Sequence, residues 1–206
     1  MSEPQRKLLK TLIVGKPNVG KSTLLNSIVG EKVSIVSRKA QTTQKNTTGV
    51  ITKDNSQLIF FDTPGLNKIE KNIRISETFK TVAENVDVLI YMVDNTKKSQ
   101  SIDDQFRNWL NNNENKFKKK ILIINKIDCI EKVNLFEITK KINGVINFDE
   151  TFFISLSKKS GMERFLNWVE KQAYSNDWLF QQTYKSNISK KKFLSELTRE
   201  KVFEYI

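Results

Sequence analysis

The residues best placed by type and spacing to do chemistry lie between Gly15 and Ser22. They read Gly-Lys-Pro-Asn-Val-Gly-Lys-Ser, a pattern typical of loops that bind the phosphates of a nucleoside triphosphate. Glycines let backbone N–H groups close around phosphate oxygens. The N-terminus of a following helix also favours an anion.

Within this loop, Lys21 is expected to reach the β- and γ-phosphates, and the Ser22 hydroxyl to bind Mg²⁺. The predicted phosphate contacts are Gly15, Lys16, Pro17, Asn18, Val19, Gly20, Lys21, Ser22 and Thr23. A plain glycine turn between a strand and a helix is the alternative interpretation.

A second candidate group, Asp62-Thr63-Pro64-Gly65, follows the apolar run 57–61. A carboxylate at the end of a strand beside a phosphate loop can hold Mg²⁺ through water, and the Gly65 N–H can meet a γ-phosphate. The tetrapeptide alone is weak evidence, but its place after a predicted strand strengthens it.

The third group is Asn125-Lys126-Ile127-Asp128. A carboxylate at Asp128 can accept hydrogen bonds from N1–H and the 2-amino group of guanine together. Adenine offers neither donor and would leave the carboxylate unpaired. Lys126 can lay its alkyl stem along the purine face while Asn125 braces the loops, so the predicted ligands are GTP and GDP.

These groups need a scaffold that brings strand ends together. Apolar runs predict strands at 8–14, 57–61, 86–93, 120–124 and 151–154, and helical spacing recurs between them. This alternation predicts an α/β fold with a doubly wound, mostly parallel sheet, as in P-loop NTPases of the small G-protein type. Ser101 with Asp104, and Ser160 with Glu163, have the spacing of helix N-terminal capping boxes.

The sequence pattern suggests that the chain is divided into three parts. Residues 1–175 are predicted to form the GTP-binding domain, with a long polar functional loop at 31–48. Residues 176–189 are predicted as a linker. Residues 190–206 have the pattern of a basic amphipathic helix, which either docks on the main domain or opens an incomplete second domain.

Composition narrows the chemistry further. The 206 residues include no histidine and one cysteine, which excludes imidazole catalysis, an internal disulfide and a multi-cysteine zinc site. No apolar run approaches the roughly 18 residues of a spanning helix, and no signal peptide is recognisable, so we expect a cytoplasmic protein. A net charge of +12 favours RNA or an anionic membrane surface as partner, although the lysine runs are scattered.

The motifs together resemble translation-factor-related GTPases. Ser37-Arg38-Lys39-Ala40-Gln41-Thr42-Thr43 and Asp62-Thr63-Pro64-Gly65-Leu66 are similar to the corresponding segments of the Era family, bacterial GTPases of ribosome assembly. Residues 193–201 resemble the first helix of that family's RNA-binding KH domain. The resemblance covers essentially the whole chain.

The resemblance implies further site residues. Thr43 would close on Mg²⁺ and the γ-phosphate, with Thr42 as the alternative, and Ser155, Leu156 and Ser157 would form the last guanine loop. Leu156 departs from the usual Ser-Ala of the family. In similar GTPases an asparagine at the position of Asn18 helps to seat K⁺; a turn-stabilising role is the alternative.

The implied reaction is attack of water on the γ-phosphorus of GTP, with Lys21, Thr43 and Gly65 as catalytic residues. Ras-like proteins have a water-orienting glutamine where this chain has Leu66, so we expect slow turnover without a partner.

The implied partners are small-subunit ribosomal RNA and the small ribosomal subunit, together with a possible peripheral contact at the inner face of the cell membrane. The G-x-x-G loop with which the KH domain holds RNA does not follow residues 193–201. Two alternatives remain: a GTPase of tRNA modification, and a nucleotide-dependent scaffold at an RNA or membrane surface.

Overall fold

The structure is a computed structural model. It describes residues 5–34, 47–62, 67–69, 72–74, 77–96, 100–113, 116–188 and 198. The helices, strands and contacts of the fold are those of these described residues.

A seven-stranded sheet forms the centre of the molecule. Its strands are β1 (Lys7–Gly15), β2 (Thr47–Lys53), β3 (Ser56–Asp62), β6 (Val88–Val93), β7 (Lys119–Ile124), β8 (Glu150–Phe153) and β9 (Tyr174–Ser175). The order is β2-β3-β1-β6-β7-β8. β2 runs antiparallel to β3 and β9 antiparallel to β1, whereas the other neighbours are parallel. A separate hairpin joins β4 (Asn67–Ile69) to β5 (Asn72–Arg74).

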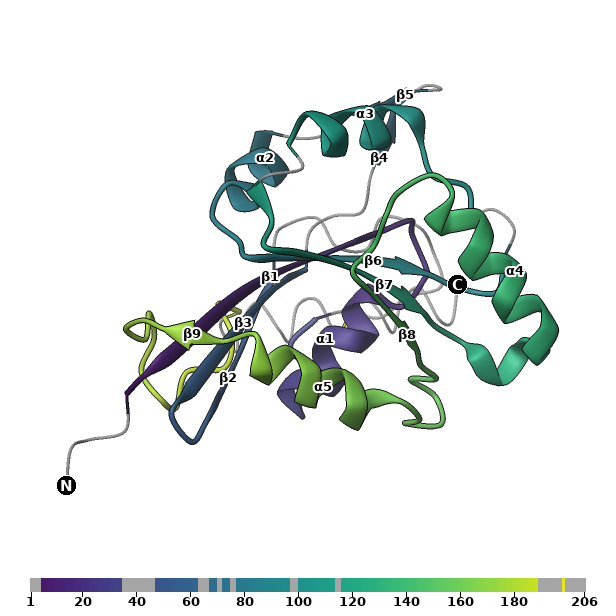
Figure 1. Ribbon diagram of the computed structural model, residues 1–206. Helices are drawn as coiled ribbons and strands as arrows, with labels where there is room; N and C mark the ends of the chain where they lie inside the picture. Colours follow the sequence, from purple (N-terminus) through teal and green to yellow (C-terminus); the bar gives the residue numbers. More distant parts are fainter. Residues whose placement is uncertain are drawn as a thin grey trace.

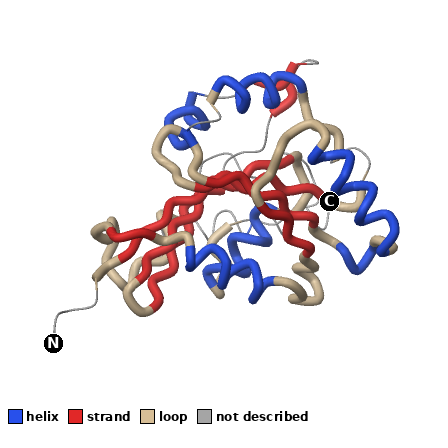
Figure 2. The backbone as a smooth tube through the Cα atoms, in the orientation of Figure 1, coloured by secondary structure: helices blue, strands red, loops and turns tan. Residues whose placement is uncertain are grey.

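Helices cover both faces of this sheet (Figure 1). They are α1 (Lys21–Val29), α2 (Glu77–Ala83), α3 (Asp104–Asn112), α4 (Lys132–Asn143) and α5 (Met162–Lys171), and a short 3-10 helix, η2, spans Ile127–Cys129. Helices α1 and α5 lie on one face, and α2, α3 and α4 lie on the other. Figure 2 shows the strands as a layer between these two sets of helices.

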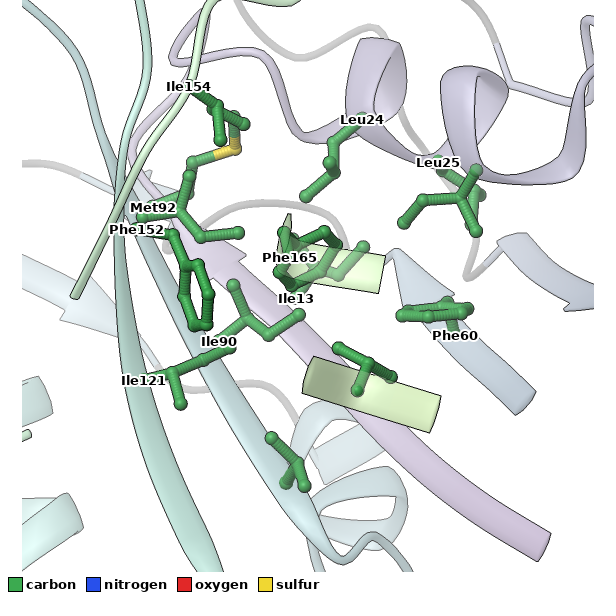
Figure 3. Close-up of a cluster of buried hydrophobic side chains, with 14 of the residues drawn as sticks. Ile13, Leu24, Leu25, Phe60, Ile90, Met92, Ile121, Phe152, Ile154 and Phe165 are labelled. Carbon is green, nitrogen blue, oxygen red and sulfur yellow. The ribbon is translucent and has the colours of Figure 1, made fainter. Parts of the chain in front are cut away.

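Alternation along the central strands produces the two cores. On β1, Leu9 and Ile13 pack with α1 and α5, whereas Leu12 and Val14 pack toward α2, α3 and α4. Figure 3 shows Ile13 among the side chains of the first cluster. A parallel strand with helices on both faces must be apolar on both, which explains the nearly continuous apolar runs. The predicted doubly wound α/β fold is confirmed.

Local details differ from the sequence-based expectations. β2 begins at Thr47, inside the predicted loop 31–48, and the β4–β5 hairpin was not foreseen. The hairpin escaped prediction because it has only two three-residue strands in a polar stretch.

Both predicted capping boxes are wrong. Helix α3 begins at Asp104, and the Asp103 Oδ1 atom accepts from the Phe106 N–H at 3.4 Å. The Ser101 hydroxyl instead accepts from Lys16 Nζ at 2.6 Å. Helix α5 starts after Gly161, which adopts a left-handed conformation and has no side-chain cap. In each case the Ser-x-x-acid spacing lies near the start of a helix, but it predicts the wrong residue as the helix N-cap.

The segment 176–188, predicted as a linker, lies against β2 and β3 (Figure 1). Its anchor is Gln57, a fully buried side chain on β3. The Gln57 carbonyl accepts from the N–H groups of Leu179 and Phe180 at 2.9 and 3.0 Å, and its amide donates to the Phe180 carbonyl at 2.9 Å.

Further along, this segment pairs with the outer edge of β2. The Val50 N–H donates to the Lys185 carbonyl at 2.8 Å, and the Thr48 N–H to Asn187 Oδ1 at 3.0 Å. We refer to residues 176–188 as the edge strap. The proposed domain limits at 175 and 189 stay predictions, and the predicted helix 190–206 lies outside the described residues except for Thr198.

Candidate nucleotide-binding site

The three predicted motifs meet at the carboxyl ends of parallel strands. Gly15 ends β1, Asp62 ends β3, and Asn125 follows β7 directly. In open α/β sheets ligands bind at this edge. The topology therefore places the phosphate loop, the carboxylate of Asp62 and the predicted guanine loop around one site.

The phosphate loop needs both glycines because other chain segments approach it closely. A Cβ on Gly15 would clash with the Met92 carbonyl on β6, and one on Gly20 would clash with the Asn125 amide. Gly20 also has a φ of 108°, which favours glycine. The loop is consequently held against β6 and the loop after β7.

Lys21, the first residue of α1, is buried. Its Nζ atom donates to the carbonyls of Gly15 and Lys16 at 2.9 and 3.0 Å, so the ammonium lies inside the curve of the loop. Burial lowers the pKa of Lys21, and the nearby charge of Asp62 partly opposes that effect. A phosphate oxygen entering the loop would meet a cation that is already in place.

Ser22 and Asp62 lie together beneath the loop. The Ser22 hydroxyl donates to Asp62 Oδ2 at 2.8 Å, and the Ser34 hydroxyl to the same atom at 3.3 Å. Asp62 is fully buried, which raises its pKa, while the charge of Lys21 and the two hydroxyl donors oppose the rise.

These two residues fit a Mg²⁺ site completed by a ligand. Asp62 Oδ1 is buried and has no hydrogen-bond partner among the described residues, which is unusual unless another group meets that atom. The same part of the chain has no cluster of three or more His, Cys, Asp or Glu that could bind a metal alone. Mg²⁺ is commonly held by one or two protein ligands together with phosphate oxygens and water.

Asn125 connects three loops. Its amide donates to the Val19 carbonyl of the phosphate loop at 2.9 Å, and its Oδ1 accepts from the Leu156 N–H at 3.3 Å. The next residue, Lys126, donates from Nζ to the Asn18 carbonyl at 3.1 Å and forms an ion pair with Asp94 at 2.6 Å. Asn125 and Lys126, two adjacent residues of the predicted guanine loop, therefore each donate a hydrogen bond to the phosphate loop.

The carboxylate of Asp128 is exposed and charged. The Ser155 hydroxyl donates to Oδ1 at 2.5 Å, and the Ser157 hydroxyl to Oδ2 at 3.1 Å. Chiefly because of the Ser155 bond, the pKa of Asp128 is lowered. The structure therefore joins Asp128 to the loop 155–157 and keeps it a charged acceptor, as the predicted contacts with the guanine N1–H and amino group require.

Some predicted contacts lie outside the described residues: Thr43 with its neighbour Thr42, Gly65 and Leu66. Their roles stay predictions, as do the nucleotide contacts of all other residues named above. Sequence reasoning missed Ser34 and Asp94. Asp94 could have been found, because it is a polar residue directly after the apolar strand β6, as Asn125 is directly after β7.

No helix in the described ranges has the length and apolar character needed to cross a membrane.

Comparison with known proteins identifies the family. The profile of the family described as "50S ribosome-binding GTPase" matches residues 10–126. GTPase Era of Sinorhizobium medicae is 31% identical over 195 residues, which cover 93% of this chain and 61% of that protein. GTPase Era of Bordetella pertussis is 32% identical over 210 residues, covering 100% of this chain and 69% of that protein.

A solved structure agrees with these matches. The crystal structure of Era in complex with MgGDPNP and nucleotides 1506–1542 of 16S ribosomal RNA superposes with a TM-score of 0.79 at 32% identity. The match covers 95% of this chain and 67% of that one. The chain spans 61% of the length of the Sinorhizobium relative, so it corresponds to only part of such a protein. On the profile match and the coverage of the Bordetella relative, this chain belongs to the Era family of GTPases.

Proposed function

We propose that this chain binds GTP and GDP, hydrolyses GTP slowly with Mg²⁺, and serves as the nucleotide-dependent switch of a protein that assembles the small ribosomal subunit. One observation carries the proposal. The buried ammonium of Lys21, the Ser22–Asp62 pair and the carboxylate of Asp128 lie around one edge of the sheet, and Asn125 braces the loops between them. Phosphate, metal and guanine contacts are available there together.

Catalysis in such a site consists mainly of positioning and neutralising charge. Lys21 is fixed by two backbone carbonyls and would stabilise the negative charge that grows on the phosphate oxygens. Ser22 and Asp62 would hold Mg²⁺, which would neutralise further negative charge of the phosphates when bound.

We expect hydrolysis to be slow. Thr43 and the Gly65 N–H are proposed to contact the γ-phosphate region, but an apolar side chain at Leu66 cannot orient water. Intrinsic turnover on the order of 10⁻⁴ to 10⁻² s⁻¹ is expected, as for GTPases without external help. Single-turnover hydrolysis faster than about 1 s⁻¹ would contradict this expectation.

Base selection is the sharpest test of the proposal. Calorimetry should show binding of GDP and GTP and no comparable binding of ATP. Asp128→Asn replaces one of the two carboxylate acceptors with an N–H donor, and we expect GDP affinity to fall by about 100-fold or more while xanthosine diphosphate gains affinity. Equal uptake of ATP and GTP, or unchanged GDP affinity in the variant, would overturn the proposed site.

A potassium site at Asn18 is a finer part of the proposal. Asn18 is exposed in the phosphate loop at a φ of 67°, a conformation that asparagine tolerates better than most residues. If its side chain helps to seat K⁺, replacing K⁺ by Na⁺ at constant ionic strength should slow GTP turnover. Equal rates in both salts would leave Asn18 with a turn-stabilising role only.

The RNA part of the proposal rests on the Era relative solved with 16S ribosomal RNA and on the net charge of +12. It concerns the whole protein, which we place in the cytoplasm, with any membrane contact peripheral. Pull-down of the whole protein from cells, followed by sequencing of bound RNA, should recover small-subunit ribosomal RNA. Enrichment of tRNA instead would favour a tRNA-modifying GTPase.

A further inference from the structure

Asp94 is a buried carboxylate that the proposed function leaves without a role. It follows β6 directly, and its side chain is only 4% exposed. A buried charge needs a partner of opposite sign and hydrogen bonds to remain charged at low cost. The contacts around Asp94 supply both.

The two carboxylate oxygens of Asp94 have different tasks. Oδ1 accepts from the Thr96 N–H at 3.0 Å and from the Thr96 hydroxyl at 2.7 Å. Oδ2 faces Lys126 Nζ at 2.6 Å. The bonds from Thr96 fix the carboxylate of Asp94, and the ion pair with Lys126 then holds the lysine.

Lys126 has a fixed position as a result. Its ammonium lies between Asp94 Oδ2 and the Asn18 carbonyl, while 40% of the side chain remains exposed. An exposed lysine stem normally samples many rotamers, and ordering it costs free energy when a ligand binds. Here the ammonium is tethered at two points, so the stem is held in one place before a nucleotide arrives.

We propose that Asp94 is a positioning residue for guanine-nucleotide binding, acting through Lys126: it tethers the ammonium on the phosphate loop so that the alkyl stem is ready to pack against the purine. The proposal rests on the proposed nucleotide site and assigns a role to a residue outside its three motifs. It also predicts that Asp94 affects affinity only while the Lys126 ammonium is present.

The variant Asp94→Asn isolates the tether. Asparagine has nearly the same shape and keeps an oxygen for the two Thr96 donors, but it turns an amide N–H toward the lysine ammonium, where two donors would meet. We expect the Kd for GDP, measured by calorimetry on the full chain, to rise about tenfold, with most of the change in faster dissociation.

Asp103→Asn is the matched control. It removes the same charge from a residue outside the proposed tether, where Asp103 Oδ1 accepts from the Phe106 N–H at the start of α3. We expect its Kd for GDP to stay within about twofold of the wild type. If the wild type itself binds no GDP, the proposed function fails. If the wild type and the Asp94→Asn variant bind GDP equally well, only the proposed role of Asp94 fails.

A double-mutant cycle separates positioning from a merely structural role. Lys126→Met keeps an apolar stem and removes the ammonium. In that background Asp94→Asn should change GDP affinity by less than about twofold. An equal loss in both backgrounds, or no loss in the wild-type background, overturns the proposal.

Folding is checked by urea unfolding without nucleotide. If Asp94→Asn does not fold, the variant Thr96→Val is used in its place. Thr96 is exposed, and this change removes one hydrogen-bond donor to Asp94 while the carboxylate stays in place. We then expect about threefold weaker GDP binding with Lys126 present and none of that loss with Lys126→Met. Unchanged affinity of Thr96→Val with Lys126 present would overturn the proposal equally.

Discussion

Single side chains in this site carry defined electrostatic tasks. Asp128 is held charged by two serine hydroxyls, whereas the buried Lys21 is held by backbone carbonyls. The difference matters because an exposed carboxylate can exchange its serine donors for those of a base. The buried ammonium of Lys21, in contrast, gains a new partner only when an anion enters the loop.

Cys129 offers a direct test at this scale. It is the single cysteine of the chain, it is exposed, and its Sγ atom lies 3.7 Å from Asp128 Oδ2. If guanine binds beside Asp128 as proposed, we expect it to cover this thiol. At GDP about ten times above its Kd, only about one molecule in ten is unoccupied, so alkylation by iodoacetamide should slow about tenfold.

The controls for this measurement are ADP and Asp128→Asn. ADP should leave the alkylation rate unchanged, and in the variant xanthosine diphosphate should protect the thiol in place of GDP. Undiminished alkylation at saturating GDP would mean that the base does not lie beside Asp128.

At the scale of elements, the buried side chain of Gln57 joins the edge strap to β3 by hydrogen bonds. Gln57 satisfies two N–H groups and one carbonyl of residues 179 and 180 and also donates to the Thr52 hydroxyl at 3.1 Å. An apolar residue at this position would leave those backbone groups without partners.

We therefore expect Gln57→Leu to lower the free energy of unfolding by about 3 kcal/mol, because unpaired buried polar groups cost more than the lost bonds themselves. Urea unfolding measures this value. Gln182→Leu, the same change at an exposed position of the strap, should cost less than about 0.5 kcal/mol. A small effect of Gln57→Leu would mean that the strap detaches without consequence.

Elements with a strong local pattern could be predicted from the sequence. The buried strands β6 and β7 are long apolar runs, and the phosphate loop has a fixed spacing of glycines and lysine. The contacts of Gln57 and Asp94 could not be recognised in the same way, because their partners lie 123 and 32 residues away along the chain, although the place of Asp94 directly after an apolar strand marks it as a candidate. A polar residue reveals such a role only once folding has brought the partner close.

At the scale of the whole molecule, stability depends on pH through groups that join distant elements. Asp149 directly precedes β8 and contacts the start of β7: its Oδ2 accepts from the Lys120 N–H at 2.7 Å and its Oδ1 from Lys119 Nζ at 2.9 Å. Partial burial alone would raise the pKa of Asp149, but these bonds and the lysine charges outweigh it and lower the pKa.

A pKa lowered in the folded state stabilises the protein above the unfolded value of about 3.9, and this stabilisation is lost as the pH falls through the folded pKa. We expect Asp149→Asn to cost about 1 kcal/mol at neutral pH. The difference from the wild type should shrink as the pH falls below about 3.9 and vanish once the pH lies below the folded pKa.

Urea unfolding across this pH range measures both quantities. Asp177→Asn, at an exposed position, is the matched control and should follow the wild type throughout. A constant difference between wild type and Asp149→Asn at all pH values would show that the loss comes from shape and not from charge.

The contact of the edge strap with β2 has a practical consequence for anyone shortening this protein. Removing everything after β9 would strip the partners from the Thr48 and Val50 N–H groups and leave a bare strand flank, a known template for association between molecules. Such a trimmed polypeptide should self-associate even with its nucleotide pocket intact. A fragment that does not self-associate should therefore extend at least through Asn187.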